Sequence, residues 1–380
     1  MSASAERQYC IYRDAIKHLP EEYDPARCVF FEKASREIRE NSEFIIFAKK
    51  AIEDEEMKRG RTFTYWMMNG HMEYRAGRDP TPYYLVAQKM LQEKQIRAAH
   101  FNYFVNSWRS LELFQNFELE KNDFSTKLNT DTWEKVEFSL KDPVSIDFTV
   151  LVGCDSIYAI KYLKLLIHSV NKAKLEFRLL VRVYILNPTQ DVNVFMVELK
   201  DYVDKLEKIF LDIIFIKSDD INVDKALLTS MRFLYLPQSL KKTSVPTIVV
   251  DIDSYFESSI FSCLSQLQKK IDVGIMGYEG HLNHQLDQPW RTAAGAVFVN
   301  ANINGETYSK CVKHYIENVY STDVDYQNRN LNWGIDQVAL SRSIDYLKND
   351  TIKFGDLKIG PHIDFARSDK ELFLEKYGFK

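Results

Sequence analysis

Through about the first 120 residues, apolar positions recur at three- and four-residue spacing with charged positions between them, a pattern typical of amphipathic helices. Prolines and glycines interrupt the pattern and mark the ends of helices. Many of the apolar positions are aromatic, but no clean repeat period is present. We interpret residues 1–120 as an α-helical accessory domain whose aromatic side chains form its core. The spacing predicts helices over residues 6–17, 25–50, 82–93 and 95–119.

Polar residues accumulate after this half, and the pattern then changes to short apolar strands that alternate with helical segments. The polar composition of residues 121–145 predicts a linker between two domains. Strand–helix alternation predicts an α/β domain over residues 146–380 with a mostly parallel sheet covered on both faces. The predicted strands cover residues 147–153, 177–186, 210–217 and 247–250, and the predicted helices cover residues 156–171, 192–206 and 225–240.

Composition narrows the class of protein without identifying it. A chain of 380 residues with 45% hydrophobic and 27% charged residues is long enough for two globular domains. The net charge of −4 argues against a general nucleic-acid binder. No apolar run reaches the roughly 18 residues of a membrane span, and no signal-peptide pattern opens the chain. The five cysteines form no Cys-x-x-Cys pair, so their spacing indicates neither a disulfide framework nor a zinc site. We expect a reducing, cytoplasmic location.

The segment from Thr247 to Ser254 is the most informative part of the chain. Its β-branched residues predict a buried parallel strand, and Asp251 and Asp253 follow at the carboxyl end, where open α/β sheets bind ligands. Side chains at positions i and i+2 of an extended segment point the same way, so both carboxylates can face one hard cation. Mg²⁺ or Mn²⁺ held by few protein ligands keeps positions open for nucleotide phosphates. The pair therefore predicts a metal-assisted phosphate site.

Further polar residues stand at positions suited to a nucleotide-sugar ligand. Asp155 and Tyr158 open a predicted helix just after a strand, where a base and ribose could bind, although Asp155 could simply cap that helix. Arg232 lies on the helix before the aspartate strand, where it can contact phosphates, aspartates or only solvent. Gly295 precedes a strand, and it could allow close approach of a ligand or form a bulge.

Two later segments extend this set of candidate residues. Asp336 and Gln337 lie near the start of a predicted helix, where the dipole favours a carboxylate that could face a reacting sugar or merely stabilise the helix. His362 lies in a loop after a short predicted strand. Its imidazole could complete the metal site begun by the two aspartates, or it could be an ordinary surface residue.

The order of these segments resembles that of GT-A fold glycosyltransferases, and it is most similar to glycosyltransferase family 8, the glycogenin- and galactosyltransferase-like enzymes. The resemblance covers residues 146–366 and is carried by the whole set in order. The elements of that set are small-Asp-x-x-Tyr before a helix, Arg-Phe-x-x-Leu-Pro, Asp-x-Asp, Ala-Gly-x-x-x-x-Asn, Asp-Gln and a late histidine.

The resemblance implies a hexosyltransferase-like enzyme that moves a sugar from a nucleotide-diphosphate sugar, expected to be a UDP-sugar, to a glycan or protein acceptor with retention of configuration. It also implies Mn²⁺ or Mg²⁺, bound by Asp251, Asp253 and His362. The implied donor-site and catalytic residues are Asp155 and Tyr158 for the base, Arg232 and Asp251 for the diphosphate, Ala294 and Gly295 for the sugar pocket, and Asp336 and Gln337 for the transferred sugar.

The chain departs from the family pattern at two places. The Lys-Pro-Trp segment that contacts the diphosphate in the family is absent, so we expect Arg367 or Lys370 to supply the positive charge. Ala293 stands where the family has asparagine before Ala-Gly.

Two alternatives remain open: a haloacid-dehalogenase-like phosphatase that uses the Asp-x-Asp, and a non-catalytic transferase-like scaffold. We expect the helical accessory domain, residues 1–120, to recruit an acceptor or to hold a homo-oligomer together.

Overall fold

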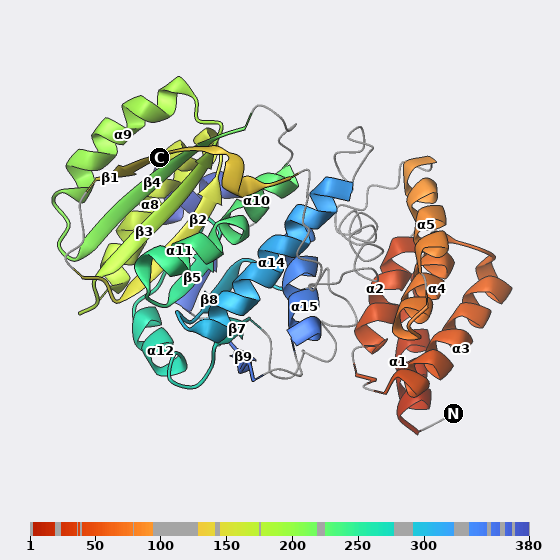
Figure 1. Ribbon diagram of the computed structural model, residues 1–380. Helices are drawn as coiled ribbons and strands as arrows, with labels where there is room; N and C mark the ends of the chain where they lie inside the picture. Colours follow the sequence, from red (N-terminus) through yellow and green to blue (C-terminus); the bar gives the residue numbers. More distant parts are fainter. Residues whose placement is uncertain are drawn as a thin grey trace. The chain divides into compact units, whose positions relative to one another are not determined.

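The computed structural model of the protein describes two compact units (Figure 1). The first unit contains helices α1 to α5, and the second contains the β-sheet. The helix expected over residues 95–119 lies outside the described residues. Those residues are 3–19, 24–35, 37–38, 40–78, 80–93, 128–140, 145–174, 176–218, 225–276, 292–322, 334–347, 351–357, 362–366 and 369–379.

The helical unit has an aromatic core, as the sequence predicts. Tyr12, Phe31 and Phe47 pack against one another, and Phe31 stacks on Phe47 with ring centroids 5.1 Å apart. Each aromatic pair of this kind contributes roughly 0.5–1.5 kcal/mol beyond the area it buries. The helices are α1 (Ala3–Ile16), α2 (Asp24–Ser35), α3 (Asn41–Arg59), α4 (Phe63–Arg75) and α5 (Thr81–Glu93).

The single helix predicted over residues 25–50 is wrong, because the chain breaks between α2 and α3. The break leaves backbone and side-chain acceptors that Arg75 of α4 satisfies. Its Nη2 donates to the carbonyl oxygen of Ile38 and to Oδ1 of Asn41, both at 3.1 Å. Tertiary contact with α4 therefore compensates the hydrogen bonds that a continuous helix would have made.

The second unit is built on an eight-stranded sheet with strand order β1-β4-β3-β2-β5-β8-β7-β9. Four neighbouring pairs are parallel, β2–β3, β3–β4, β2–β5 and β7–β9, and the other three are antiparallel. The predicted α/β class, a large mostly parallel sheet preceded by helices, is confirmed. The strands are β1 (Glu134–Ser139), β2 (Phe148–Cys154), β3 (Leu179–Leu186), β4 (Ile209–Lys217), β5 (Thr247–Val250), β7 (Val273–Ile275), β8 (Ala296–Val299) and β9 (Phe354–Asp356).

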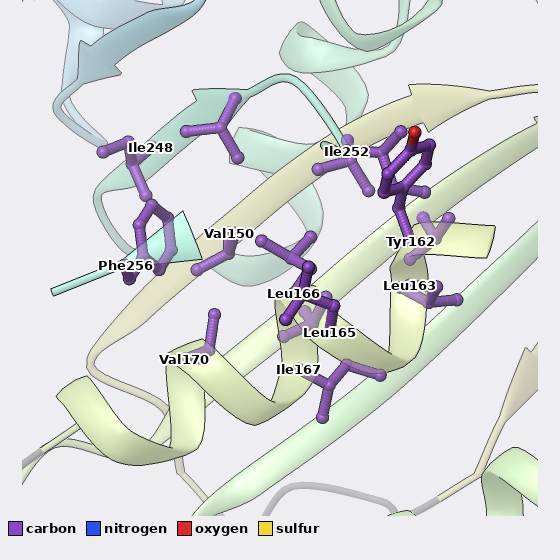
Figure 2. Packing of buried hydrophobic residues seen from close by; sticks show 14 of the residues in the cluster. Val150, Tyr162, Leu163, Leu165, Leu166, Ile167, Val170, Ile248, Ile252 and Phe256 are labelled. Atoms are coloured by element: carbon purple, nitrogen blue, oxygen red, sulfur yellow. The ribbon is translucent and has the colours of Figure 1, made fainter. Parts of the chain in front are cut away.

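Helices pack on both faces of this sheet, which explains why β2, β3 and β5 are apolar at nearly every position. On one face, Val150 of β2 and Ile248 of β5 pack with Leu166 and Val170 of α8 (Figure 2). On the other face α10 lies against β2. The helices are α8 (Ser156–Ala173), α9 (Gln190–Val203), α10 (Lys225–Leu234), α11 (Leu236–Thr243), α12 (Ile260–Leu267), α14 (Ile303–Thr322), α15 (Ile335–Leu347) and α16 (Lys370–Lys376).

Two predicted boundaries differ from the structure in this unit. The helix predicted over residues 225–240 is two helices, because Pro237 starts α11 and its ring cannot continue α10 past Tyr235. Part of the expected linker, residues 134–139, is the edge strand β1, which pairs with β4. Just before β1, the amide of Thr130 donates to the Glu317 carboxylate at 3.0 Å.

A second, two-stranded sheet pairs β6 (Ser254–Phe256) with β10 (Ile363–Phe365). Strand β6 follows β5 directly, and β10 directly precedes the segment before α16. The β6–β10 pair therefore places the segment before α16 next to the carboxyl edge of the main sheet. In the part of the chain that the structure describes, no helix combines the length and apolar character needed to cross a lipid bilayer.

Candidate active site

Asp251 and Asp253 lie at the carboxyl edge of the main sheet, as the sequence predicts. Strand β5 ends at Val250, and the amide of Asp251 donates to the carbonyl oxygen of Gly295 at 3.2 Å. The chain turns at Asp253 before β6 instead of staying extended. Because of this turn, the two carboxylates bind two different cationic side chains, Arg232 and Lys370.

Arg232 is the centre of the buried half of this site. It lies on α10, and its residue is only 3% exposed. One guanidinium nitrogen donates to the Asp251 carboxylate. The other donates to the carbonyl oxygen of Ala294 at 3.1 Å and to Oδ2 of Asp336 at 3.3 Å. A planar guanidinium can bridge three acceptors in this way, whereas a lysine ammonium could not match the same fork geometry.

Close packing brings α10 near enough to the sheet for these contacts. A Cβ on Gly153 of β2 would lie 2.7 Å from the backbone nitrogen of Arg232. Any side chain at that position would therefore push α10 away from β2. Gly153 therefore fixes how closely α10, and with it Arg232, approaches the ends of the strands. Sequence reasoning did not single out this glycine.

Asp336 enters the site from the first turn of α15, where the helix dipole favours a carboxylate. The amide of Gln337 donates to Asp336 Oδ1 at 2.9 Å, so this carboxylate also stabilises its own helix. Burial raises the pKa of Asp336, and the Arg232 charge opposes that rise. The helix-stabilising role foreseen for this aspartate is therefore present, and its other carboxylate oxygen accepts a hydrogen bond from Arg232.

The pKa of Asp251 is raised to about 6. Burial is the main cause, Arg232 opposes it, and the negative charges of Asp253 and Asp336 raise the pKa further. About a third of the Asp251 side chain is nevertheless accessible, 35% against 8% for Asp336. Three aspartates thus lie close enough together for their charges to interact, and one buried arginine binds two of them.

Lys370 forms the more exposed half of the site. Its Nζ donates to Oδ2 of Asp253 at 2.7 Å and to the hydroxyl of Tyr158 at 3.0 Å, and it lies 4.6 Å from the Tyr158 ring centroid. Burial lowers the pKa of Lys370, but the hydrogen bonds to Asp253 and Tyr158 outweigh burial, and the net shift is upward. The lysine is therefore a firmly charged cation with 34% of its side chain accessible.

Asp155 takes the capping position that was one of its two expected roles. It is the N-cap of α8, and its Oδ1 accepts a hydrogen bond from the amide of Tyr158 at 2.7 Å. The same hydrogen bond fixes the first turn of α8, which carries the Tyr158 ring toward Lys370.

Gly295 keeps space beside the Asp251 carboxylate. A Cβ at Gly295 would lie 3.2 Å from Asp251 Oδ2 and 3.3 Å from the ring of Phe365. Phe365, on β10, was not foreseen from the sequence because its position depends on pairing between β6 and β10. The absence of a side chain at Gly295 thus leaves room at one carboxylate oxygen, between β8 and β10.

Neither a protein-family model nor a curated protein matches this sequence. Several solved structures are similar to part of this chain. The apo-form glycosyltransferase GlyE of Streptococcus pneumoniae TIGR4 has 12% identity and a TM-score of 0.38 over 62% of this chain and 61% of that chain. The galactosyltransferase LgtC, in complex with donor and acceptor sugar analogues, has 15% identity and a TM-score of 0.32 over 49% and 69%. Mouse xyloside xylosyltransferase 1 has 11% identity and a TM-score of 0.34 over 57% and 86%.

These structural neighbours are glycosyltransferases. The chain spans about three fifths of the length of the GlyE structure. The likeness concerns the arrangement of strands and helices alone, so the chemistry of the site rests on the residues described above.

The structure does not bring His362 to the two aspartates. In the β6–β10 pair, the amide of Ala366 donates to the carbonyl of Asp253, whereas the amide of Glu257 donates to the carbonyl of His362. The three residues of β6 lie between these two points, and no group of three possible metal ligands among the described residues includes His362. The imidazole Nδ1 lies instead 3.3 Å from the hydroxyl of Ser259.

A metal ion would find oxygen ligands but no histidine among the described residues of this site. Asp251 and Asp253 supply hard carboxylate oxygens of the kind that Mg²⁺ and Mn²⁺ prefer. The glycine at 295 leaves Asp251 Oδ2 uncrowded on that side, whereas Lys370 holds Asp253. Arg367, the other candidate for a C-terminal cation, lies outside the described residues. So do residues 277–284 and 287–291, whose sequence predicts turns that could contact an acceptor or the sugar.

Proposed function

We propose that the protein is a glycosyltransferase that moves a sugar from a nucleotide-diphosphate sugar, a UDP-sugar, to a glycan or protein acceptor. The observation that carries this proposal is the bridge that buried Arg232 forms between Asp251 and Asp336 at the carboxyl edge of the sheet. This edge is where open α/β folds bind nucleotides. A preorganised cation there is suited to a diphosphate leaving group.

The donor would extend across the site from Lys370 to Asp336. Its base would lie at the start of α8, against Asp155 and Tyr158, and its diphosphate would lie between Lys370 and Arg232. Lys370 is accessible and already hydrogen-bonded to a carboxylate, so a phosphate oxygen can replace Asp253 as its acceptor.

The sugar would occupy the space beside Ala294 and Gly295, with Asp336 and Gln337 nearest to it. Arg232 already orients the Asp336 carboxylate and binds the Ala294 carbonyl. In the proposed site this one guanidinium would hold both the wall of the sugar pocket, at Ala294, and the carboxylate nearest to the sugar, that of Asp336. The diphosphate leaves toward Arg232 and Lys370, whose charges stabilise the leaving group as its bond to the sugar breaks. We assign no general base, since a retaining front-face transfer needs none from the protein.

We further propose that Asp251 and Asp253 hold Mn²⁺ or Mg²⁺ when the donor binds. Such an ion neutralises negative charge on a departing diphosphate. His362 is not included in this ligand set, because its carbonyl pairs with Glu257, four residues beyond Asp253. Lys370 and the ion would share the neighbourhood of Asp253, the lysine holding that carboxylate until the donor and metal arrive together.

A thermal-shift and calorimetric titration with UDP, GDP and UDP-sugars, with and without Mn²⁺, tests the proposal. We expect UDP-sugars to raise the melting temperature, more so with Mn²⁺, because a ligand that binds only the folded state stabilises it. Asp253→Asn should abolish the metal-dependent part. Asp364→Asn is the matched control, because Asp364 also forms a lysine pair, with Lys376, but outside this site.

The two other functions predict different outcomes. A haloacid-dehalogenase-like phosphatase would release phosphate from phosphomonoesters in the presence of Mg²⁺ and would not be stabilised by UDP-sugars. Its aspartate motif usually ends the first strand of the domain, whereas β2, β3 and β4 precede β5 here. A non-catalytic scaffold would show neither binding nor turnover. Failure of every nucleotide sugar to bind would overturn the transferase proposal.

For the helical unit we propose acceptor recruitment, or assembly of a homo-oligomer, as its role. Its exposed apolar side chains include Ile11, Ile46 and Met57, of which Met57 is 76% exposed. Sedimentation of the intact protein, compared with a variant carrying Met57→Lys, separates these roles. A change in mass would favour assembly, and an unchanged mass with a raised acceptor KM would favour recruitment.

A further inference from the structure

The helical unit contains a buried cluster of three potential metal ligands that the proposed function does not use. Cys28 and Glu32 lie on α2, and His71 lies on α4. All three are buried, and the Cys28 Sγ, one Glu32 carboxylate oxygen and one His71 ring nitrogen lie within 4.8 Å of one another. Glu32 Oε1 lies 3.2 Å from His71 Nε2 and 3.9 Å from Cys28 Sγ.

Two features of the helical unit bring the side chains of Cys28, Glu32 and His71 together. Residues four apart on a helix lie on the same face, so α2 presents Cys28 and Glu32 side by side. Helix α4 packs against α2 and brings His71 to that face. The His71 ring also stacks on Phe31 of α2, with centroids 6.3 Å apart and planes within 8° of parallel.

A second contact fixes the direction of the imidazole. His71 Nδ1 lies 2.7 Å from the hydroxyl of Tyr84 on α5, a distance at which the two form a hydrogen bond. This bond leaves Nε2 facing Glu32 and Cys28. Metal-binding histidines in proteins characteristically have the other ring nitrogen held by a hydrogen bond of this kind. Gly70 contributes to this geometry, because a Cβ there would lie 2.2 Å from the Tyr84 ring.

We propose that Cys28, Glu32 and His71 form a structural zinc site that joins α2 to α4. A thiolate, a carboxylate and an imidazole are three of the ligand types that Zn²⁺ accepts in tetrahedral sites. With bonds of about 2.0–2.3 Å, ligand atoms of one tetrahedral ion lie roughly 3.3–3.5 Å apart. The observed 3.2 Å and 3.9 Å separations need only a small movement of Cys28. The fourth position would take water or one further donor.

Charge and proton balance favour the same assignment. On binding, the Cys28 thiol loses its proton to solvent, and the imidazole keeps one proton on Nδ1, where it is donated to the Tyr84 hydroxyl. One Zn²⁺, one thiolate and one carboxylate then carry no net charge. A neutral complex suits this apolar surrounding far better than an isolated ion would. Mn²⁺ and Mg²⁺ are excluded as preferred ions, because they favour all-oxygen ligand sets.

The experiment measures the metal content of the intact protein. Protein purified without chelator from zinc-supplemented medium should contain about one zinc per chain by elemental analysis. Cys28→Ser and His71→Asn should lose it. Cys10→Ser is the matched control, because Cys10 lies on α1 of the same unit and outside the cluster, and it should keep the zinc. The double variant Asp251→Asn, Asp253→Asn should also keep it, which separates this site from the proposed donor site.

A second readout does not depend on whether the variants fold. Replacement of zinc by Co²⁺ in the unmodified protein should give a thiolate-to-cobalt charge-transfer band, and added Zn²⁺ should abolish this band. Removal of the metal should also lower the melting temperature, and added zinc should restore it. Folded protein that neither contains zinc nor takes it up in titration would overturn the proposal, whatever the outcome at the donor site.

Discussion

Arg232→Met tests how much the candidate site depends on one buried charge. The substitution keeps a long side chain in place but removes the guanidinium that binds Asp251, Asp336 and the Ala294 carbonyl. Asp336 is then a carboxylate with 8% of its side chain accessible and no cation from Arg232. Removing one partner of a buried pair typically costs roughly 3–5 kcal/mol in unfolding free energy. For a unit of this size, the melting temperature should fall by roughly 6–20 °C.

Urea denaturation in a chelating buffer provides the measurement, with Arg178→Met as the control. Arg178 is exposed, so its substitution should change the unfolding free energy by less than about 0.5 kcal/mol. A double-mutant cycle that combines Arg232→Met with Asp336→Asn should give a coupling free energy of about 1–3 kcal/mol. The reason is that the neutral asparagine, unlike the buried Asp336 carboxylate, is not destabilised by loss of the Arg232 charge.

Salt dependence distinguishes the two halves of the Arg232 bridge. The coupling to Asp336 should persist at high ionic strength, because water and ions have little access to that pair. The coupling to Asp251 should weaken, because 35% of that side chain is accessible. A coupling to Asp336 below about 0.5 kcal/mol, or equal salt sensitivity of both pairs, would refute the reasoning that the bridge is a buried ionic centre.

Three further substitutions test other parts of the structure. Lys370→Met should raise the Kd for UDP on the order of tenfold, because a charge-assisted hydrogen bond is lost. The same substitution should lower the Kd for Mn²⁺, because Asp253 is released. Calorimetry that finds both constants changed in the same direction would contradict this. Gly295→Ala should crowd Asp251 and Phe365 at a cost of about 1–3 kcal/mol, measured as a lowered melting temperature together with a raised donor KM. Asp272→Asn should cost about 1.5–3 kcal/mol at pH 7. Burial raises the pKa of Asp272, but hydrogen bonds from the Lys353 amide and two asparagines lower it more, so the folded pKa lies below the unfolded one. This stabilisation is present above about pH 4 and is lost as the pH falls further, so urea midpoints of parent and variant should converge in acid.

The parts of the fold that sequence predicted well are those decided by local pattern. Strands β2, β3, β4 and β5 are continuous apolar runs, and burial on both faces produces that composition wherever it occurs. Boundaries were less predictable where a tertiary contact decides them. The break after α2 depends on Arg75, which lies more than thirty residues further along the chain. Strand β1 was hidden because its residues are mostly polar and exposed along an edge.

The candidate site shows the same division between local and long-range information. Asp251 and Asp336 were found because each stands at a recognisable place, a strand end or a helix start, and Arg232 because it lies on the helix before the aspartate strand. The position of His362 could not be found in this way, because it depends on the register between β6 and β10, which no local pattern states. The Cys28–His71 cluster was missed because its ligands come from two helices and match no short cysteine motif.

The pairing of Lys370 with Asp253 has a consequence for the order in which the molecule becomes complete during synthesis. The two residues are separated by 117 positions in the chain. At translation rates of roughly 5–20 residues per second, Asp253 is synthesised about 6–23 s before its lysine. Strand β5, its neighbour β2, and β3 and β4 are made before that interval, whereas β10 and α16 come only at its end. A nascent chain therefore exposes an uncompensated aspartate at the end of a formed strand, and a translational pause or premature stop before residue 370 would leave it so.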